Sequence, residues 1–187
     1  MPRKRHVQRR RIFIGCEGDG ERGYITFIAN TLEHVHSRIY IDAKLLRPGG
    51  GDPLALVQVA QTIIQREERN REPYERKFLI IDNDKIGISQ NRDQQAYALA
   101  ARIGASFIWQ ITAHEALLLR HLPGCAMRRP PSTATAEQQL RREWPEYAKP
   151  MSAAAIGRTL DIESLRQANG VEPELAVFLS EIGLFPA

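Results

Sequence analysis

The chain of 187 residues is 43% hydrophobic and carries a formal net charge of +4 at pH 7, which suits one globular domain with a core of its own. No apolar run approaches the roughly 20 residues of a membrane-spanning helix, and no signal-peptide pattern opens the chain, so we expect a cytoplasmic protein. The two cysteines, Cys16 and Cys125, are too few for a disulfide framework or a structural zinc site, and we expect reduced thiols.

The chain opens on a strongly basic segment. Without the six basic residues of its first eleven positions, 20 basic residues face 22 acidic ones, so the remainder carries a charge of about −2. Such an arm on a nearly neutral body is a common means of binding nucleic-acid phosphates, and a solvated leader that keeps the protein in solution is an equally good interpretation. The basic residues are Arg3, Lys4, Arg5, Arg9, Arg10 and Arg11.

Apolar runs typical of strands then alternate with helical patterns, in which apolar residues recur every three or four positions. Asp52 and Pro53 are placed as the N-cap and the first residue of the second helix, and Gly104 ends the third. The alternation predicts an α/β fold with a mainly parallel, four-stranded sheet flanked by helices. The expected strands are 11–16, 38–46, 77–82 and 105–112, and the expected helices are 24–38, 53–70, 91–103 and 114–122.

The alternation stops beyond Pro123. Residues 127–139 are interpreted as a polar, proline-rich connection, and residues 138–149 as a short helix cut by Pro145. Two short terminal helices are expected within 161–170 and 172–185, with Asp161 at the start of the first. We therefore expect a basic tail at 1–10, an α/β domain at 11–123, and a helical extension at 124–187 that packs on the same domain.

Acidic residues follow three of the four expected strands. Glu17 and Glu21 come after the first strand, Asp82 and Asp84 after the third, and Glu115 after the fourth. Because parallel strands end at one edge of a sheet, these carboxylates are expected to gather there. Like charges resist ionisation together unless a cation neutralises them, and oxygen ligands favour Mg²⁺ or Mn²⁺ over zinc or copper.

An alternative interpretation of these acidic residues is turn chemistry. Asp82 and Asp84 would by themselves fit a turn that caps the next helix, and the Gly-Asp-Gly at 18–20 is an ordinary tight turn. The occurrence of both acidic segments after apolar strands, at the same predicted edge, favours the metal site.

These motifs resemble those of the TOPRIM fold, which occurs in topoisomerases, bacterial primases and several nucleases. CEGDGERGYITFI at 16–28 is similar to its first motif, and KFLIIDND at 77–84 is similar to its second, the Asp-x-Asp motif. The resemblance implies that Glu17, Asp82 and Asp84 bind Mg²⁺ and support phosphodiester chemistry.

A closer resemblance, over about residues 10–122, is to the RloB-like proteins, small TOPRIM-like proteins encoded near restriction or abortive-infection loci. It is carried by the first acidic motif, by a glycine-rich loop that ends at Asp52 and Pro53, and by QITAHEALLLRH at 110–121. That last segment departs from the family pattern at four positions. The resemblance implies phage defence and a partner such as an ATPase or a restriction-modification protein. The departures are Ile111, Thr112, His114 and Leu117.

The sequence therefore predicts a metal-dependent nuclease, or alternatively a non-catalytic module that binds nucleic acid or nucleotides. Glu17 is a candidate general base or second-metal ligand, and Glu21, four residues further, is expected to share its helical face. Glu115 is a further catalytic candidate, although a first-turn acid that favours the helix dipole is the simpler interpretation. Lys85 is a candidate phosphate contact or an ordinary surface lysine. DNA or RNA as substrate, and monomer or homodimer, stay open.

Overall fold

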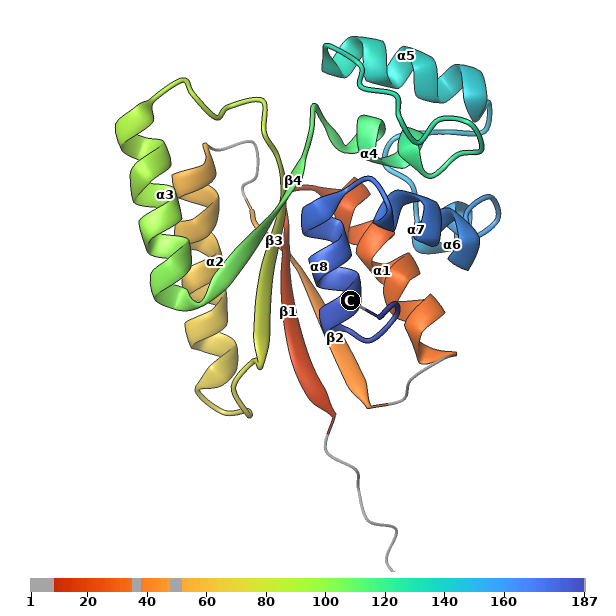
Figure 1. Ribbon diagram of the computed structural model, residues 1–187. Coiled ribbons are helices and arrows are strands. Elements are labelled where there is room, and N and C mark those ends of the chain that lie inside the picture. The colour runs from red at the N-terminus through yellow and green to blue at the C-terminus, as the bar shows by residue number, and fades with distance from the viewer. Residues whose placement is uncertain (1–8, 35–37, 48–51, 187) are drawn as a thin grey trace, which may run out of the picture.

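A parallel four-stranded sheet forms the centre of the computed structural model, which describes residues 9–34, 38–47 and 52–186. The strand order is β2-β1-β3-β4, and every neighbouring pair is parallel (Figure 1). The predicted α/β class is thereby confirmed. All four carboxyl ends lie at one edge, where Asp82 is in register with Gln110. The strands are β1 (Arg10–Cys16), β2 (Ile39–Leu45), β3 (Arg76–Asp82) and β4 (Ala105–Gln110).

Helices cover both faces of the sheet (Figure 1). Helices α2 (Pro53–Glu68) and α3 (Gln90–Ile103) pack on one face, against a core that includes Phe13, Leu79 and Ile81. Helices α1 (Asp19–Glu33) and α8 (Pro173–Glu181) pack on the other face, with Ile12, Ile14 and Ile80. Successive side chains of a strand point to opposite faces of the sheet, so the uninterrupted apolar run in β3 contributes side chains to both cores.

Two of the predicted helix ends are built as expected. The Asp52 side chain accepts a hydrogen bond from the Ala55 N–H at 2.9 Å, which caps α2 at its N-terminus ahead of Pro53. Gly104 follows α3 with a φ of 69°, a left-handed conformation that glycine adopts without a steric penalty.

Two other helix starts were predicted wrongly. Helix α1 begins at Asp19 instead of residue 24, because the Glu21 carboxylate turns back to accept from the Gly18 N–H at 3.0 Å and so caps the first turn. Helix α5 (Thr133–Glu143) occupies much of the expected connection, and its N-cap is Ser132, which accepts from the Thr135 N–H.

The C-terminal region contributes helices to the α1 face. Phe178 of α8 packs edge-to-face on Phe78 of β3, with ring centroids 5.2 Å apart. The buried Arg120 at the end of α4 (His114–Arg120) forms an ion pair with Glu172. The remaining helices are α6 (Ala153–Ile156), which the sequence did not predict, and α7 (Ile162–Asn169), which it did.

Both cysteine thiols are free and buried. None of the helices in the described part of the chain combines the length and the apolarity that a membrane crossing requires.

A close backbone contact joins α1 to the segment that precedes α6. A Cβ atom at Gly23 would lie 2.1 Å from the Met151 carbonyl oxygen. We therefore expect Gly23→Ala to lower the free energy of unfolding by about 1–3 kcal/mol, as overpacking does, measured by urea denaturation. Gly170→Ala is the control, because its Cβ would meet its nearest atom at 3.5 Å, and a change of similar size there would contradict the assignment.

Candidate functional site

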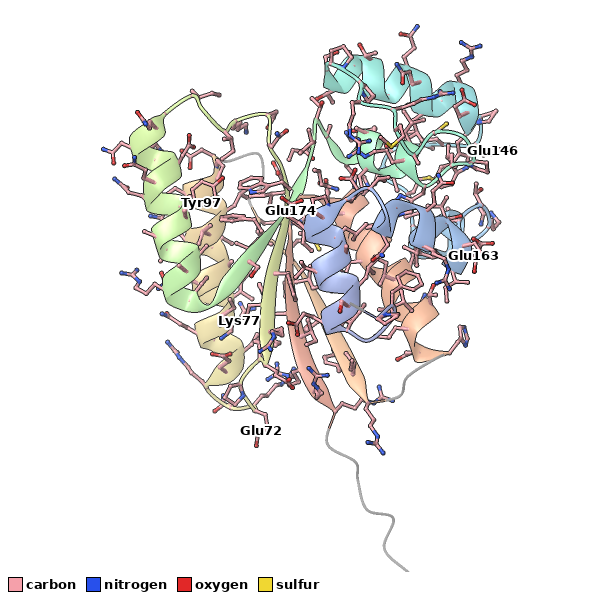
Figure 2. The ribbon with its side chains drawn as sticks, in the orientation of Figure 1. Glu72, Lys77, Tyr97, Glu146, Glu163 and Glu174 are labelled. Carbon is pink, nitrogen blue, oxygen red and sulfur yellow. The ribbon has the colours of Figure 1, made fainter. Side chains whose placement is uncertain are left out.

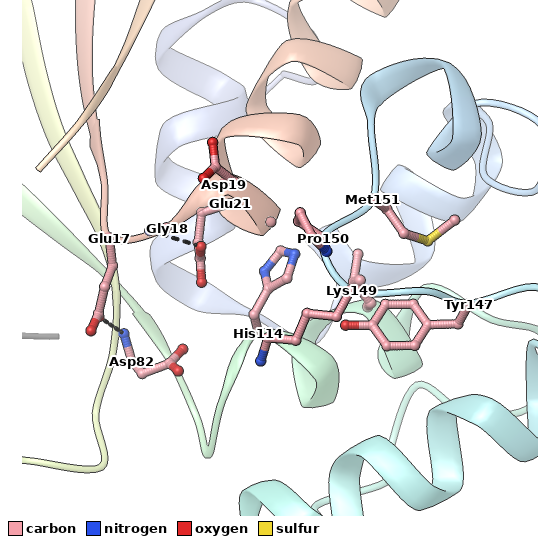
Figure 3. Close-up of a pocket in the computed structure, with 12 residues that line it drawn as sticks. Glu17, Gly18, Asp19, Glu21, Asp82, His114, Tyr147, Lys149, Pro150 and Met151 are labelled. Carbon is pink, nitrogen blue, oxygen red and sulfur yellow. Dashed lines mark hydrogen bonds between the residues drawn. The ribbon is translucent and has the colours of Figure 1, made fainter. Parts of the chain in front are cut away.

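A pocket of about 380 Å³ opens at the edge where the strands end (Figure 3). Its carboxylate side is formed by Glu17 after β1, Glu21 in the first turn of α1, and Asp82 at the end of β3. The opposite side comes from residues 147–151, which follow α5 in the chain. Residues far apart in the sequence therefore meet at the edge that the parallel topology predicts.

Glu17 reaches across from β1 to the neighbouring strand. Its backbone N–H donates to the Ile80 carbonyl at 3.3 Å, and its carboxylate oxygen Oε2 accepts from the Asp82 N–H at 3.2 Å. Glu17 is therefore bound to the backbone of β3 at Ile80 and at Asp82, and these two bonds hold its carboxylate beside Asp82.

Glu21 lies in the same pocket, although for a different reason than the sequence suggested. Glu17 precedes α1, so the two residues do not share a helical face, and that part of the prediction was wrong. The bond from the Gly18 N–H to Glu21 Oε2 instead turns the side chain back over the start of the helix, toward the end of β1. Glu21 is only 7% exposed as a result, and its carboxylate lies in the pocket with Asp82.

Gln110 joins these carboxylates from the end of β4. With its amide nitrogen facing them, Gln110 donates to Glu21 Oε1 at 3.2 Å and to Asp82 Oδ1 at 2.9 Å, and its oxygen accepts from His114 Nδ1 at 2.6 Å. This orientation satisfies every neighbour, and it places the proton of the imidazole on Nδ1. The fully buried amide therefore acts as a neutral bridge between two acids and a histidine.

The carboxylates raise one another's proton affinity. Burial, followed by the charges of Glu21, Glu17, Glu115 and Asp84, raises the pKa of Asp82 to about 8. Burial also raises the pKa of Glu17, and the hydrogen bond from the Asp82 N–H opposes that rise. A half-buried cluster of this kind carries an electrostatic cost that a bound cation would relieve.

Lys149 brings a positive charge to the opposite side of the pocket. Its ammonium nitrogen lies 2.6 Å from Glu115 Oε1, which also accepts from the Tyr147 hydroxyl at 3.0 Å. Burial raises the pKa of Glu115, but the hydrogen bonds to its carboxylate and the charge of Lys149 together outweigh burial, and the net shift is downward. Glu115 is therefore an ionised, buried anchor for Lys149, and its second oxygen, Oε2, is buried with no hydrogen-bond partner in the structure.

Two buried histidines lie behind the carboxylates. Burial lowers the pKa of His114, so its imidazole is neutral, and it lines the pocket. His121 donates from Nδ1 to the Leu117 carbonyl and accepts at Nε2 from the Tyr24 hydroxyl, both at 2.9 Å. Burial lowers the pKa of His121 to about 4, and both of its ring nitrogens are used in buried hydrogen bonds.

The other predicted site residues lie at the margin of the cluster. Asp84 is exposed, although its charge raises the pKa of both Glu17 and Asp82, and the charge of Lys85 lowers that of Glu17. Across the residues that the structure describes, no three acidic, histidine or cysteine side chains are arranged as a ready-made metal site. The all-oxygen donors and the unrelieved negative charge fit Mg²⁺ or Mn²⁺, and binding would require the side chains to close around the ion.

The described arginines of the basic tail lie away from the pocket. Arg3, Lys4 and Arg5 fall outside the described residues. Arg10 and Arg11 lie at the amino end of β1, the end of the sheet where Figure 2 shows Glu72 and Lys77, opposite the pocket.

The three described arginines of the basic tail each contact another residue of the chain. Arg10 forms a bidentate pair with Glu75 at 2.6 and 2.7 Å, and Arg11 donates to the Glu72 carbonyl and stacks on Tyr74 at 4.1 Å. Arg9 lies 3.8 Å from Glu33. Phosphate binding by these arginines stays a prediction.

Sequence reasoning missed two residues that line the pocket, Tyr147 and Lys149, and one that bridges its carboxylates, Gln110. A polar Gln110 at the end of an otherwise apolar strand was an available signal, because it is the register partner of Asp82. Tyr147 and Lys149 gave no such signal, since only the path of the chain after α5 brings them to the edge.

Comparisons of the chain with protein-family models, with curated proteins and with solved structures find no match.

The raised pKa of Asp82 predicts how stability depends on pH in the metal-free protein. Between about pH 4 and pH 8 the folded state binds more protons than the unfolded state, so the free energy of unfolding falls as pH rises. Asp82→Asn removes this charge and keeps an oxygen for Gln110. We expect it to raise the melting temperature at about pH 9 by roughly 2–4 °C, and less at about pH 5, in EDTA.

Asp161→Asn is the matched control. Hydrogen bonds from the backbone and side chain of Ser164 lower the pKa of Asp161, so its charge stabilises the fold at high pH and its removal brings no gain. An Asp82→Asn variant that is destabilised equally at both pH values would contradict the electrostatic account.

Proposed function

We propose that this protein is a Mg²⁺- or Mn²⁺-dependent enzyme that cleaves phosphodiester bonds in nucleic acid. The observation that carries the proposal is Asp82, whose pKa is raised to about 8 by burial and by the acidic groups gathered around it. A binding module has no need of such a costly cluster, whereas a cation-dependent enzyme needs one. The parallel sheet with flanking helices is consistent with the TOPRIM-like resemblance.

In this proposal Glu17, Asp82 and Asp84 hold the cation. When bound, Mg²⁺ supplies positive charge to a substrate phosphate and helps to activate water. In the alternative arrangement, in which Asp82 and Asp84 alone hold the cation, Glu17 is the candidate proton acceptor, because burial raises its pKa. Glu21 is fixed by Gly18 and Gln110, so it orients the others and adds negative charge.

The side of the pocket opposite the carboxylates would receive the phosphate. Lys149 is the one lysine or arginine among the described pocket-lining residues, and half of its side chain is exposed despite the contact with Glu115. A cation anchored on a buried carboxylate is held in place before a substrate arrives, which is how charge stabilisation becomes effective in catalysis. His114 is neutral and can accept a proton only at Nε2.

Metal-dependent cleavage tests the proposal. We expect the wild-type protein to bind Mn²⁺ and Mg²⁺ saturably in titration calorimetry and to cleave an oligonucleotide from a panel of single- and double-stranded DNA and RNA. Asp82→Asn should abolish the binding and reduce cleavage by roughly 100-fold or more. The control is Glu163→Gln, which removes an exposed acid on α7 that pairs with Arg166 (Figure 2).

Equal metal binding by wild type and Asp82→Asn, with both folded, would sink the proposal. The protein would then be a non-catalytic binding module, and Asp82 and Asp84 would be turn residues.

Lys149 gives a second, independent readout of the same site. We expect Lys149→Met to reduce turnover by about 10²-fold while Mn²⁺ binding persists, since Lys149 acts on the phosphate and not on the metal. Lys149→Arg should recover part of the lost activity, because the charge is kept. If Lys149→Met lowers only the melting temperature, Lys149 is a structural partner of Glu115 alone.

A further inference from the structure

A second pocket of about 380 Å³ lies on α5, and its lining is basic. Arg128 and Arg129 line it from the segment before the helix, and Arg142 lines it from the last turn. Pro130, Pro131, Gln139 and Glu143 complete the lining. We call it the α5 arginine groove. Three guanidinium groups against one carboxylate leave an excess of two positive charges.

Two of the guanidinium groups are fixed by contacts within the chain. Arg128 donates to Glu143 at 2.8 Å. Arg129 donates to the carbonyls of Ala126 and Val171 and lies 3.4 Å from Glu172. Because Glu172 already pairs with the buried Arg120, it does not cancel the charge of Arg129. Fixed guanidinium forks lose little entropy when they bind a phosphate.

The third guanidinium group has no partner among the residues that the structure describes. Arg142 forms no ion pair or hydrogen bond with any other residue in the ranges that the structure describes, and it is exposed. The preceding arginine, Arg141, is by contrast paired with Glu137 at 2.7 Å. A groove with two positioned cations and one unused cation is suited to an anionic ligand.

Two contacts link the segments that carry the groove to segments next to or within the carboxylate pocket. The Thr112 hydroxyl, in the loop between β4 and α4, donates to the Pro130 carbonyl at 2.8 Å. On the other side of α5, Arg141 donates to the Tyr147 carbonyl at 3.1 Å, and its guanidinium carbon lies 5.5 Å from the centre of the Tyr147 ring. Figure 1 shows α5 beyond the carboxyl ends of the strands, the same end of the molecule as the pocket.

We propose that the α5 arginine groove binds the phosphate backbone of nucleic acid at a point beside the carboxylate pocket. Arginine guanidinium groups recognise phosphate oxygens through paired N–H donors, and a positive groove that follows a backbone is the usual means of holding nucleic acid without reading its sequence. That the bound nucleic acid is also the substrate of the carboxylate pocket rests on the proposed function. The binding of nucleic acid by the groove does not.

The test measures binding separately from cleavage. Fluorescein-labelled single- and double-stranded oligonucleotides of DNA and RNA are titrated with Asp82→Asn protein in EDTA, at several salt concentrations. We expect the added double substitution Arg128→Ala/Arg142→Ala to weaken binding by about tenfold or more, and to reduce the slope of log affinity against log salt by roughly 1 to 2.

The matched control is Arg102→Ala/Arg158→Ala in the same background. Both of these arginines are exposed and lie outside the groove, so the net charge changes equally. If the two double variants bind equally well, or lose affinity equally, the groove is not a specific contact and the inference is overturned. Circular dichroism and melting temperature establish that each variant is folded.

The outcomes separate the inference from the proposed function. Oligonucleotide binding that depends on the groove, without any cleavage by the wild type, supports the inference and contradicts the nuclease. Cleavage by the wild type with no effect of Arg128→Ala/Arg142→Ala on affinity contradicts the inference and leaves the nuclease intact.

Discussion

Repulsion between carboxylates at one edge of a parallel sheet is the constraint on which the site depends. Parallel pairing of β1 with β3 brings Glu17 beside Asp82, and the cap of α1 adds Glu21. The hydrogen bonds that stabilise these carboxylates come mainly from neutral donors, namely two backbone N–H groups and the Gln110 amide. Neutral donors stabilise an ionised acid but do not cancel its charge, and burial together with the charges of the neighbouring acids still raises the pKa of Asp82 to about 8.

Lys149, the basic residue among the described residues that line the pocket, comes from outside the strand–helix alternation. Lys149 follows α5, and its own segment is pressed against α1 where Gly23 leaves room for the Met151 carbonyl. The position of Lys149 is set by Glu115, which is buried and lies directly after the start of α4. The same acid that repels Asp82 thus holds the lysine that opposes the repulsion, so the two halves of the pocket are electrostatically linked.

Features that depend on local patterns could be predicted from the sequence. The apolar runs predicted the four strands, and their alternation with helices predicted that the strands run parallel. Asp52–Pro53 and Gly104 correctly marked the start of α2 and the end of α3. The carboxylate edge followed from topology alone. The start of α1 could not be predicted in this way, because Glu21 caps it through a glycine N–H, and Gly-Asp-Gly resembles a turn when tertiary contacts are unknown.

Features that depend on pairing across the fold were not predictable. Arg10 and Arg11 belong to a basic run in the sequence, yet their partners are Glu75 and the Glu72 carbonyl, some sixty positions away. The same limit applies to Lys149, whose partner Glu115 lies 34 residues earlier. A run of basic residues in the sequence shows only that positive charges are present. Whether such a charge is available to a ligand depends on which acidic groups the fold places beside it.

This distinction decides where a polyanion would bind. A nucleic acid that approaches the carboxylate pocket meets repulsion until a cation is bound, so affinity has to come from positive groups beside the pocket. The described arginines at the amino end of β1 are on the far side of the sheet and are already engaged by Glu75, Asp42 and Glu33. The α5 arginine groove lies at the same end of the sheet as the pocket, and its lining carries more positive than negative groups. A parallel sheet has two chemically different ends, and on this chain the exposed arginines of α5 lie at the end that carries the carboxylate pocket.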